Sequence, residues 1–300
     1  MHEISEIDVD ELALSGSFTV GGLTIAHVSD GVEVAPRQTW FHGVAPELWL
    51  PAVGAPSVDH RFPVTYGCFA IIGDGPVTLV DSGWGERARD RDGIRSGGRM
   101  LERLAELGVD RHDVGRVLQT HLHSDHCGSL MTGDDPTFPN ADVYVSSREL
   151  EWWMGPESKA SSMAEFTQSR MEPLIVAGRV RTFEGDRRVT DSVTMLATPG
   201  HTAGHCAVSV TSGDECALLL GDVIHHPVHL EQHGWLKKMD IDPAESVRSR
   251  RRMASLAAER NAIVTAPHLP ILTLGRVEHL GEDRFRYRRV EVRADGRVER

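Results

Sequence analysis

The densest group of potential metal ligands in this chain lies between residues 120 and 128, which read THLHSDHCG. Four side chains within six residues can bind a metal ion: His121, His123, Asp125 and His126. Imidazole nitrogens and carboxylate oxygens are ordinary ligands of divalent cations. In an extended segment alternate side chains share a face, so the first three would point the same way and His126 would begin a turn. We predict a metal site here.

Three more metal-competent side chains follow later in the chain, each just after an expected strand. These are His201, Asp222 and His268. A lone histidine or aspartate at the end of a strand is more often a hydrogen-bonded cap than a ligand. Together with the stretch 120–128, however, the three indicate one site, because loops at the ends of neighbouring strands can converge.

The order of these residues, His-x-His-x-Asp-His and then His, Asp and His, resembles the metallo-β-lactamase fold superfamily of metallohydrolases. The resemblance extends from about Leu23 to His268. It implies an α/β (α+β) fold, a four-layer αββα sandwich with two metals in a cleft at the edge of the sheets. Asp81 resembles an acid of the first motif of that superfamily, which orients the ligands from behind.

The resemblance also implies a ligand set. One metal would take His121, His123 and His201, the other would take Asp125, His126 and His268, and Asp222 would bridge the two. Ligands of nitrogen and oxygen without thiolate suit zinc, although manganese, iron and cobalt fit the same donors. We therefore expect two divalent metal ions, with zinc as the first choice.

Such a centre predicts hydrolysis in which a metal-bridging hydroxide attacks an electrophile. Asp125 would accept the proton of the hydroxide and return it to the leaving group. Because no side-chain nucleophile is needed, Ser82 and Ser124 are not candidates. The expected substrate is a small apolar ester, either a lactone or a carboxylic ester, and phosphotriesterase activity is a further expectation.

Differences between this sequence and other branches of the superfamily narrow the choice of branch. The bridging Asp222 argues against the β-lactamases proper, and His123 stands where flavodiiron proteins usually have glutamate. Local features at 15–18 with 28–31, in the long aromatic loop before Asp81, at 221–225 and at 267–270 resemble methyl parathion hydrolase-like enzymes, whose branch also contains the N-acyl homoserine lactonases. His225 occupies the position of a tyrosine that assists the substrate carbonyl in the lactonases. It could donate a hydrogen bond to a developing oxyanion or simply bond its own loop.

Two alternatives stay open at this point. A glyoxalase II-like thioesterase would use a helical C-terminal domain, for which the residues after His268 leave little room. A protein of another class, a di-iron redox or binding protein, could use the same ligands on the same fold. Metal analysis and a panel of substrates would separate these alternatives from a lactonase.

Aromatic residues are candidates for an apolar substrate pocket over the metals, since ligand sites are largely apolar. The alternative for each is a place in the core or in a dimer contact. His226, His229 and His233 are expected to be solvated loop residues. The pocket candidates are Trp40, Phe41, Trp49, Trp152 and Trp153.

Composition limits the partners. The chain has 300 residues, a formal net charge of -12, four cysteines and sixteen histidines. This charge repels nucleic-acid backbones, and no apolar run approaches the length of a membrane span. With no disulfide framework and no apolar leader in view, we expect a cytoplasmic protein that binds a small ester or lactone and neither nucleic acid nor membrane. A homodimer is an open expectation.

We expect the strands and helices that position these residues to form one domain. We expect a loose N-terminal arm at 1–17 and a single catalytic domain at 18–300, with a long irregular connection at 32–63. A helix should begin after the N-cap Asp242 and run to about Arg260. Its arginines, Arg248, Arg250, Arg251 and Arg252, read as one solvated face. Strands are expected at 23–28, 68–72, 77–80, 115–119, 143–145, 180–183, 193–197, 206–210, 217–220, 262–265 and 285–292, and other helices at 99–107, 149–154 and 163–175.

Overall fold

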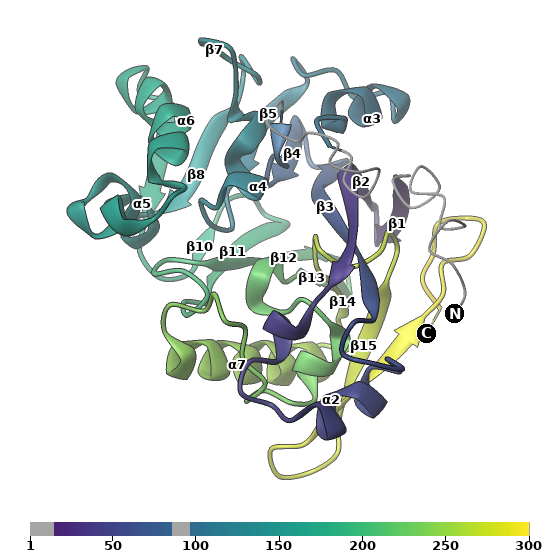
Figure 1. Cartoon of the computed structure of the whole chain (residues 1–300). Helices are drawn as coiled ribbons and strands as arrows, with labels where there is room; N and C mark the ends of the chain where they lie inside the picture. Colours follow the sequence, from purple (N-terminus) through teal and green to yellow (C-terminus); the bar gives the residue numbers. More distant parts are fainter. Residues whose placement is uncertain (1–14, 86–96, 300) are drawn as a thin grey trace.

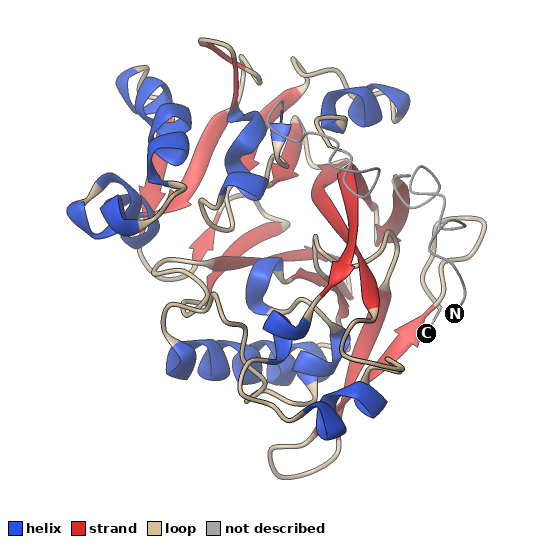
Figure 2. Cartoon of the chain, viewed as in Figure 1, coloured by secondary structure: helices blue, strands red, loops and turns tan. Residues whose placement is uncertain are grey.

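The strands form two seven-stranded sheets within residues 15–85 and 97–299, which a computed structural model describes. In the first sheet the order is β1-β2-β3-β4-β5-β8-β9, and in the second it is β10-β11-β12-β13-β14-β15-β16. Helices lie on both outer sides of the two sheets (Figures 1 and 2). The predicted four-layer αββα sandwich is therefore correct.

The first half of the chain contains one sheet and the helices that cover it. Its strands are β1 (Gly16–Val20), β2 (Leu23–Pro36), β3 (Arg61–Ile72), β4 (Val77–Val80), β5 (Val114–Leu118), β8 (Asp142–Ser146) and β9 (Val180–Phe183). Its helices are η2 (Gln38–Phe41), α2 (Pro46–Ala52), α3 (Met100–Glu106), α4 (Ser124–Cys127), η4 (Gly128–Leu130), α5 (Ser147–Met154), η5 (Pro156–Ala160) and α6 (Ala164–Val176). A small ribbon is formed by β6 (Met131–Thr132) and β7 (Asp135–Pro136).

The second half contains the other sheet and one long helix. Its strands are β10 (Arg187–Arg188), β11 (Val193–Ala197), β12 (Cys206–Ser212), β13 (Glu215–Leu219), β14 (Ile263–Thr265), β15 (Leu274–His279) and β16 (Phe285–Val290). Its helices are η6 (Gly221–Val223), η7 (Pro227–Leu230) and α7 (Pro243–Glu259). The carboxylate of Asp242 accepts a hydrogen bond from the amide of Glu245, which confirms the predicted N-cap.

Three hydrophobic clusters correspond to the three interfaces between the four layers. Met100, Trp153 and Met171 lie in the cluster between the first sheet and its helices. Phe69 lies in the cluster between the two sheets, and Met253 packs α7 onto the second sheet. Because most strands are buried on both faces, their sequences read as apolar runs rather than as alternating patterns. This is why most strand positions were visible in the sequence.

Two expectations about the N-terminal half need correction. Strand β2 continues to Pro36 and pairs with β3 as far as Arg61, so much of the expected connection at 32–63 is sheet and helix. Residues 1–14 of the expected arm lie outside the described residues, while Gly16 and Ser17 belong to β1. The many Pro, Gly and polar residues within 32–63 are typical of a loop, so the sequence did not indicate that β2 extends to Pro36. That extension depends on pairing with β3, which begins at Arg61.

Candidate metal centre

Four loops carry the candidate ligands to one edge of the two sheets, and a fifth carries Asp81. Each loop follows the C-terminal end of a strand, so the alternation of strands and loops brings distant residues together. Asp81 follows β4, His121–His126 follow β5, His201 follows β11, Asp222 follows β13, and His268 follows β14. The parallel pairs β4·β5 and β13·β14 direct their loops to the same side.

The first group of converging donor atoms consists of His121, His123, His201 and Asp222. His123 Nδ1 lies 3.0 Å from His121 Nε2 and 3.1 Å from His201 Nε2. His201 Nε2 is 3.0 Å from Asp222 Oδ2. A tetrahedral zinc ion with bonds of about 2.0–2.1 Å separates its ligands by about 3.3 Å. The spacing of these buried donors therefore fits one small cation.

The second group consists of Asp125, His126 and His268. His126 Nε2 and His268 Nε2 lie 3.2 Å apart. Asp222 Oδ1 lies 3.4 Å from the first nitrogen and 3.2 Å from the second. This oxygen is buried and has no hydrogen-bond donor among the described residues. A buried carboxylate with one oxygen facing each group fits two metal ions better than it fits a metal-free pocket.

The backbone between His121 and His126 differs in part from the expectation. His123 is extended, but Ser124–Cys127 form a helical turn whose amides bond back to the His123 carbonyl. The alternation of an extended segment therefore accounts for His121 and His123 alone. Asp125 is directed by the helical turn, which is why it faces His268 in the second group.

Asp81 lies against Thr120 and His126, at one end of the stretch that carries the first candidate ligands. Its oxygens accept hydrogen bonds from the backbone and hydroxyl of Thr120, both at 2.8 Å, and lie 2.8 Å from His126 Nδ1. Its φ of 63° is unusual for a residue other than glycine. The strained backbone at Asp81 places its carboxylate between Thr120 and His126. There it orients the imidazole of His126.

A second buried carboxylate, Asp240, supports His201 and was not found from the sequence. Its Oδ1 lies 3.1 Å from His201 Nδ1, and its Oδ2 accepts from Arg250 at 3.1 Å. Arg250 is 1% exposed and also donates to three backbone carbonyls, so the predicted solvated face is wrong for this arginine. Arg248, Arg251 and Arg252 are exposed, as expected.

Two other buried groups fix the loops themselves. Glu149 accepts hydrogen bonds from the amides of Leu122 and Gly204, which ties the first stretch of ligands to the loop that carries His201. His205 Nε2 accepts from the amide of Asp222 at 2.9 Å. Gly221 has a φ of 52°, and a Cβ there would lie 2.7 Å from that same nitrogen. Only glycine lets the bridging aspartate sit so close to His205.

Burial and nearby charges shift the pKa values of several candidate ligands. Burial lowers the pKa of His121 and His123 well below the ordinary histidine value, and the neighbouring imidazoles lower it further. Burial also acts on His126, but three aspartates, with Asp222 first, raise its pKa to about 10. Burial alone would raise the pKa of Asp222, yet His225 and Lys237 hold it well below its usual range. The centre therefore concentrates negative charge where two cations would lie.

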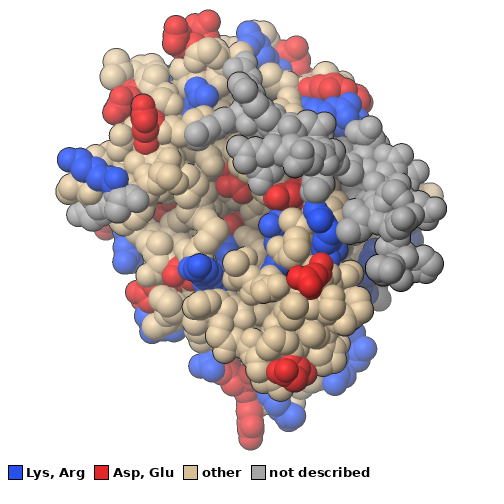
Figure 3. Space-filling view, viewed as in Figure 1, with Lys and Arg blue, Asp and Glu red and all other residues tan. Residues whose placement is uncertain are grey.

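A cavity of about 150 Å³ opens beside the second group of ligands. Figure 3 shows acidic and basic side chains around a hollow near the middle of one face of the molecule. The cavity is lined by Arg37, Thr39, Trp40, Val64, Tyr66, Asp125, His225, Lys237, Met239 and His268. Lys237 is 4% exposed, and its position fifteen residues after Asp222 in a loop gave no signal in the sequence.

The predicted aromatic wall is reduced to one member. Trp40 lines the cavity, whereas Phe41 and Trp49 stack on each other at 4.6 Å in the same aromatic cluster, behind the residues that line the cavity. Trp152 and Trp153 belong to the core beneath α5. These four are not among the described residues around the cavity, because each packs where its own helix meets the rest of the fold.

The three histidines near His225 are not solvated loop residues. His229 is fully buried, accepts from the amide of His225, and lies 3.1 Å from the carbonyl of Trp40. His226 caps η7 by accepting from the amide of Val228. His233 is 6% exposed and packs against Phe285. They support the loop that carries His225.

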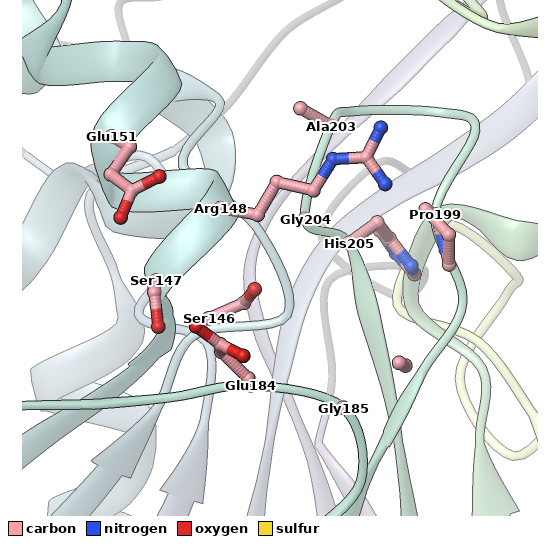
Figure 4. Close-up of a pocket in the computed structure, with 11 residues that line it drawn as sticks. Ser146, Ser147, Arg148, Glu151, Glu184, Gly185, Pro199, Ala203, Gly204 and His205 are labelled. Atoms are coloured by element: carbon pink, nitrogen blue, oxygen red, sulfur yellow. The ribbon is translucent and has the colours of Figure 1, made fainter.

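A larger cavity, of about 450 Å³, lies between α5 and the loop that carries His201. Figure 4 shows Arg148 extending from α5 toward loop residues Ala203 and Pro199, with Ser146 and Glu184 near the strand ends. His205 reaches its wall, but its Nε2 is bonded to Asp222. The cavity contains none of the seven candidate ligands, so the smaller cavity is the one at the metal centre.

Sequence comparison decides the family. A profile of the metallo-beta-lactamase superfamily matches residues 65–266, more than half of the chain. The chain belongs to this superfamily. The predicted class of enzyme, a metal-dependent hydrolase, is thereby confirmed.

Among the described residues, no helix combines the length and the apolar character needed to cross a membrane.

Curated relatives and solved structures agree with this membership. The N-acyl homoserine lactonase AiiA of Bacillus thuringiensis subsp. kurstaki is 24% identical over 210 residues, 65% of this chain and 77% of the relative. The N-acyl homoserine lactonase AttM of Rhizobium radiobacter is 27% identical over 229 residues, which cover 71% of this chain and 84% of the relative.

Two solved structures share the fold at a TM-score of 0.79. One is AidC, a dizinc quorum-quenching lactonase, with 21% identity and coverage of 93% of this chain and 98% of the other. The other is the hydrolase AbOPH of the beta lactamase superfamily, with 23% identity and coverage of 92% and 97%.

Proposed function

We propose that this superfamily member is a dinuclear, zinc-dependent hydrolase that opens a lactone or cleaves a small carboxylic ester. The observation that carries the proposal is the pair of donor groups that share Asp222, one group on each of its oxygens. The lactonase relatives support the choice of a lactone. Phosphotriesterase activity is a secondary proposal, and a glyoxalase II-like thioesterase or a di-iron protein are the alternatives.

Two bound divalent ions would supply an activated water at neutral pH and polarise the acyl oxygen of the substrate. Six side chains would hold the ions in two sets of three, and Asp222 would fix the distance between the sets. Asp125 is the one carboxylate ligand whose side chain is partly exposed, at 20%, and it lines the cavity. It can therefore receive a proton from the attacking water and deliver it to the leaving oxygen.

His225 is the second residue that we assign to the reaction. Burial lowers its pKa, so the ring is neutral at neutral pH and has one N–H to donate. Its Nε2 lies 3.1 Å from Asp222 Oδ2, and the ring faces the cavity beside His268. When metal engages Asp222, the imidazole is free to donate to the developing oxyanion instead.

The first test combines metal removal with a panel of substrates. Purified protein should contain about two zinc ions per chain and hydrolyse lactones or p-nitrophenyl esters faster than thioesters or paraoxon. Chelation should abolish the activity and lower the midpoint of thermal unfolding, because bound ions stabilise the native state. Added zinc should restore both. Two iron ions with dioxygen reactivity and no hydrolysis would contradict the proposal.

A second test concerns His225. The change His225→Phe keeps the ring shape and removes the donor, so kcat for the preferred ester should fall by about 10²-fold. The zinc content should stay at the wild-type value, measured by atomic absorption. Loss of one zinc ion would show that His225 is a ligand, which its distance from Asp222 and His268 permits, and would overturn its assignment to the oxyanion.

A further inference from the structure

Lys237 is the one buried ammonium group at the metal centre in the described part of the chain, and the proposed reaction leaves it without a task. It is 4% exposed and lines the cavity beside Asp125 and His268. Its Nζ lies 3.2 Å from Asp222 Oδ2, and 2.9 Å and 2.5 Å from Nδ1 and Nε2 of the His225 ring. A buried lysine is costly unless it is paired, so this placement requires a reason.

The backbone around Lys237 holds the ammonium in place. The amide of His42 donates to the carbonyl of Leu236, and the amide of Lys238 donates to the carbonyl of Thr39. These two bonds fasten the segment to the residues that carry Trp40 at the rim of the cavity. Lys237 is therefore part of a fixed wall and not a side chain that swings in from solvent.

The donor count leaves part of the ammonium free. A lysine has three N–H donors. Its Nζ contacts Asp222 and both ring nitrogens of His225, but a neutral imidazole has one acceptor nitrogen, so these two partners among the described residues use two of the three donors. Asp222 is also the carboxylate that faces both groups of ligands, so metal binding would draw its charge away from Lys237. The ammonium would then face the cavity with little anionic compensation.

Arg37, on the same wall of the cavity, also has a hydrogen-bond donor with no partner among the described residues. Its Nη2 pairs with Glu33 at 2.8 Å and its guanidinium lies over Trp40. The Nε–H is buried and has no hydrogen-bond partner among the described residues. The cavity is thus lined by two cationic side chains, Lys237 and Arg37, whereas Asp125 is its one acidic lining residue among those described. In a chain of net charge -12, such a local positive wall indicates an anionic ligand.

We propose that Lys237, assisted by Arg37, binds a carboxylate of the substrate, so that this enzyme prefers esters or lactones that bear an anionic group a short spacer away from the scissile carbonyl. This inference rests on the proposed function and refines its substrate class, which composition and motifs had suggested to be apolar and uncharged. A charge-assisted hydrogen bond to a buried ammonium supplies the preference.

The test compares two p-nitrophenyl esters with acyl chains of five carbons, the valerate and the mono-ester of glutaric acid. The wild type should have the higher kcat/KM for the glutarate ester. Lys237→Met and Lys237→Gln should each reduce the glutarate-to-valerate ratio by about tenfold or more, while the control Lys238→Met, at an exposed neighbour, should leave it unchanged. An equal loss on both esters would place Lys237 at the reacting oxygen and overturn the proposal.

Direct binding gives a second readout that does not depend on turnover. Calorimetry on the zinc-loaded proteins should give a Kd for free glutarate that is at least tenfold weaker in Lys237→Met and Lys237→Gln than in Lys238→Met, at equal zinc content. Coordination of glutarate by metal is common to all variants and cancels. An unchanged Kd would overturn the role of Lys237. If the wild type cleaves neither these esters nor the lactones of the first test, the proposed function fails, and the glutarate affinities still decide this inference.

Discussion

Replacing Asp222 by asparagine should reduce kcat/KM of the zinc enzyme by about 10³-fold or more. The amide is nearly isosteric, but it removes the charge that faces both groups of ligands. Polarisation and water activation by the metal pair are worth several kcal/mol in the transition state, and each 1.4 kcal/mol is a factor of ten in rate. The measurement is steady-state kinetics together with the zinc content of the purified variant.

The matched control is Asp214→Asn, an exposed aspartate in the β12–β13 turn that precedes the same loop. It removes the same charge from the chain but faces solvent, so rate and zinc content should stay at wild-type values. In Asp222→Asn we expect fewer than two zinc ions per chain. Full activity with two bound zinc ions would contradict the assignment of Asp222 as a bridge and the two-metal proposal with it.

Removing the buried arginine of α7 should have the largest effect on stability. Arg250→Met keeps much of the apolar volume but strips Asp240 of its arginine and leaves the carbonyls of Val223, His233 and Trp235 without this donor. Breaking one side of a buried ion pair typically costs about 3–5 kcal/mol. We expect the midpoint of thermal unfolding to fall by about 10 °C.

The comparison with Arg248→Met isolates burial as the cause. Arg248 lies on the same helix, is 62% exposed at its side chain and pairs with Glu245 at the surface, so its loss should change the melting temperature little. Arg250→Met should also weaken zinc binding, because Asp240 orients His201. Equal melting temperatures of the two variants would refute the structural role assigned to Arg250.

Local sequence patterns and the resemblance to the superfamily predicted the class of fold and nominated the candidate ligands, whose coordination of metal stays a prediction. Strands buried on both faces read as apolar runs, and His121, His201, Asp222 and His268 stand three or four residues after the end of such a strand. The helix from Pro243 was visible from its cap. These signals lie in neighbouring residues, so they do not depend on knowing what packs against them.

The supporting groups and the cavity were decided by tertiary structure. Arg250 and the exposed Arg248 look alike in sequence, and only the packing of α7 against the loop at 223–240 separates them. Lys237, Asp240 and Glu149 acquire their roles from partners between 10 and 55 residues away. Four of five aromatic candidates lie elsewhere for the same reason. Spacing along a strand fixes which residues can be ligands, whereas burial and charge compensation arise only when distant segments pack together.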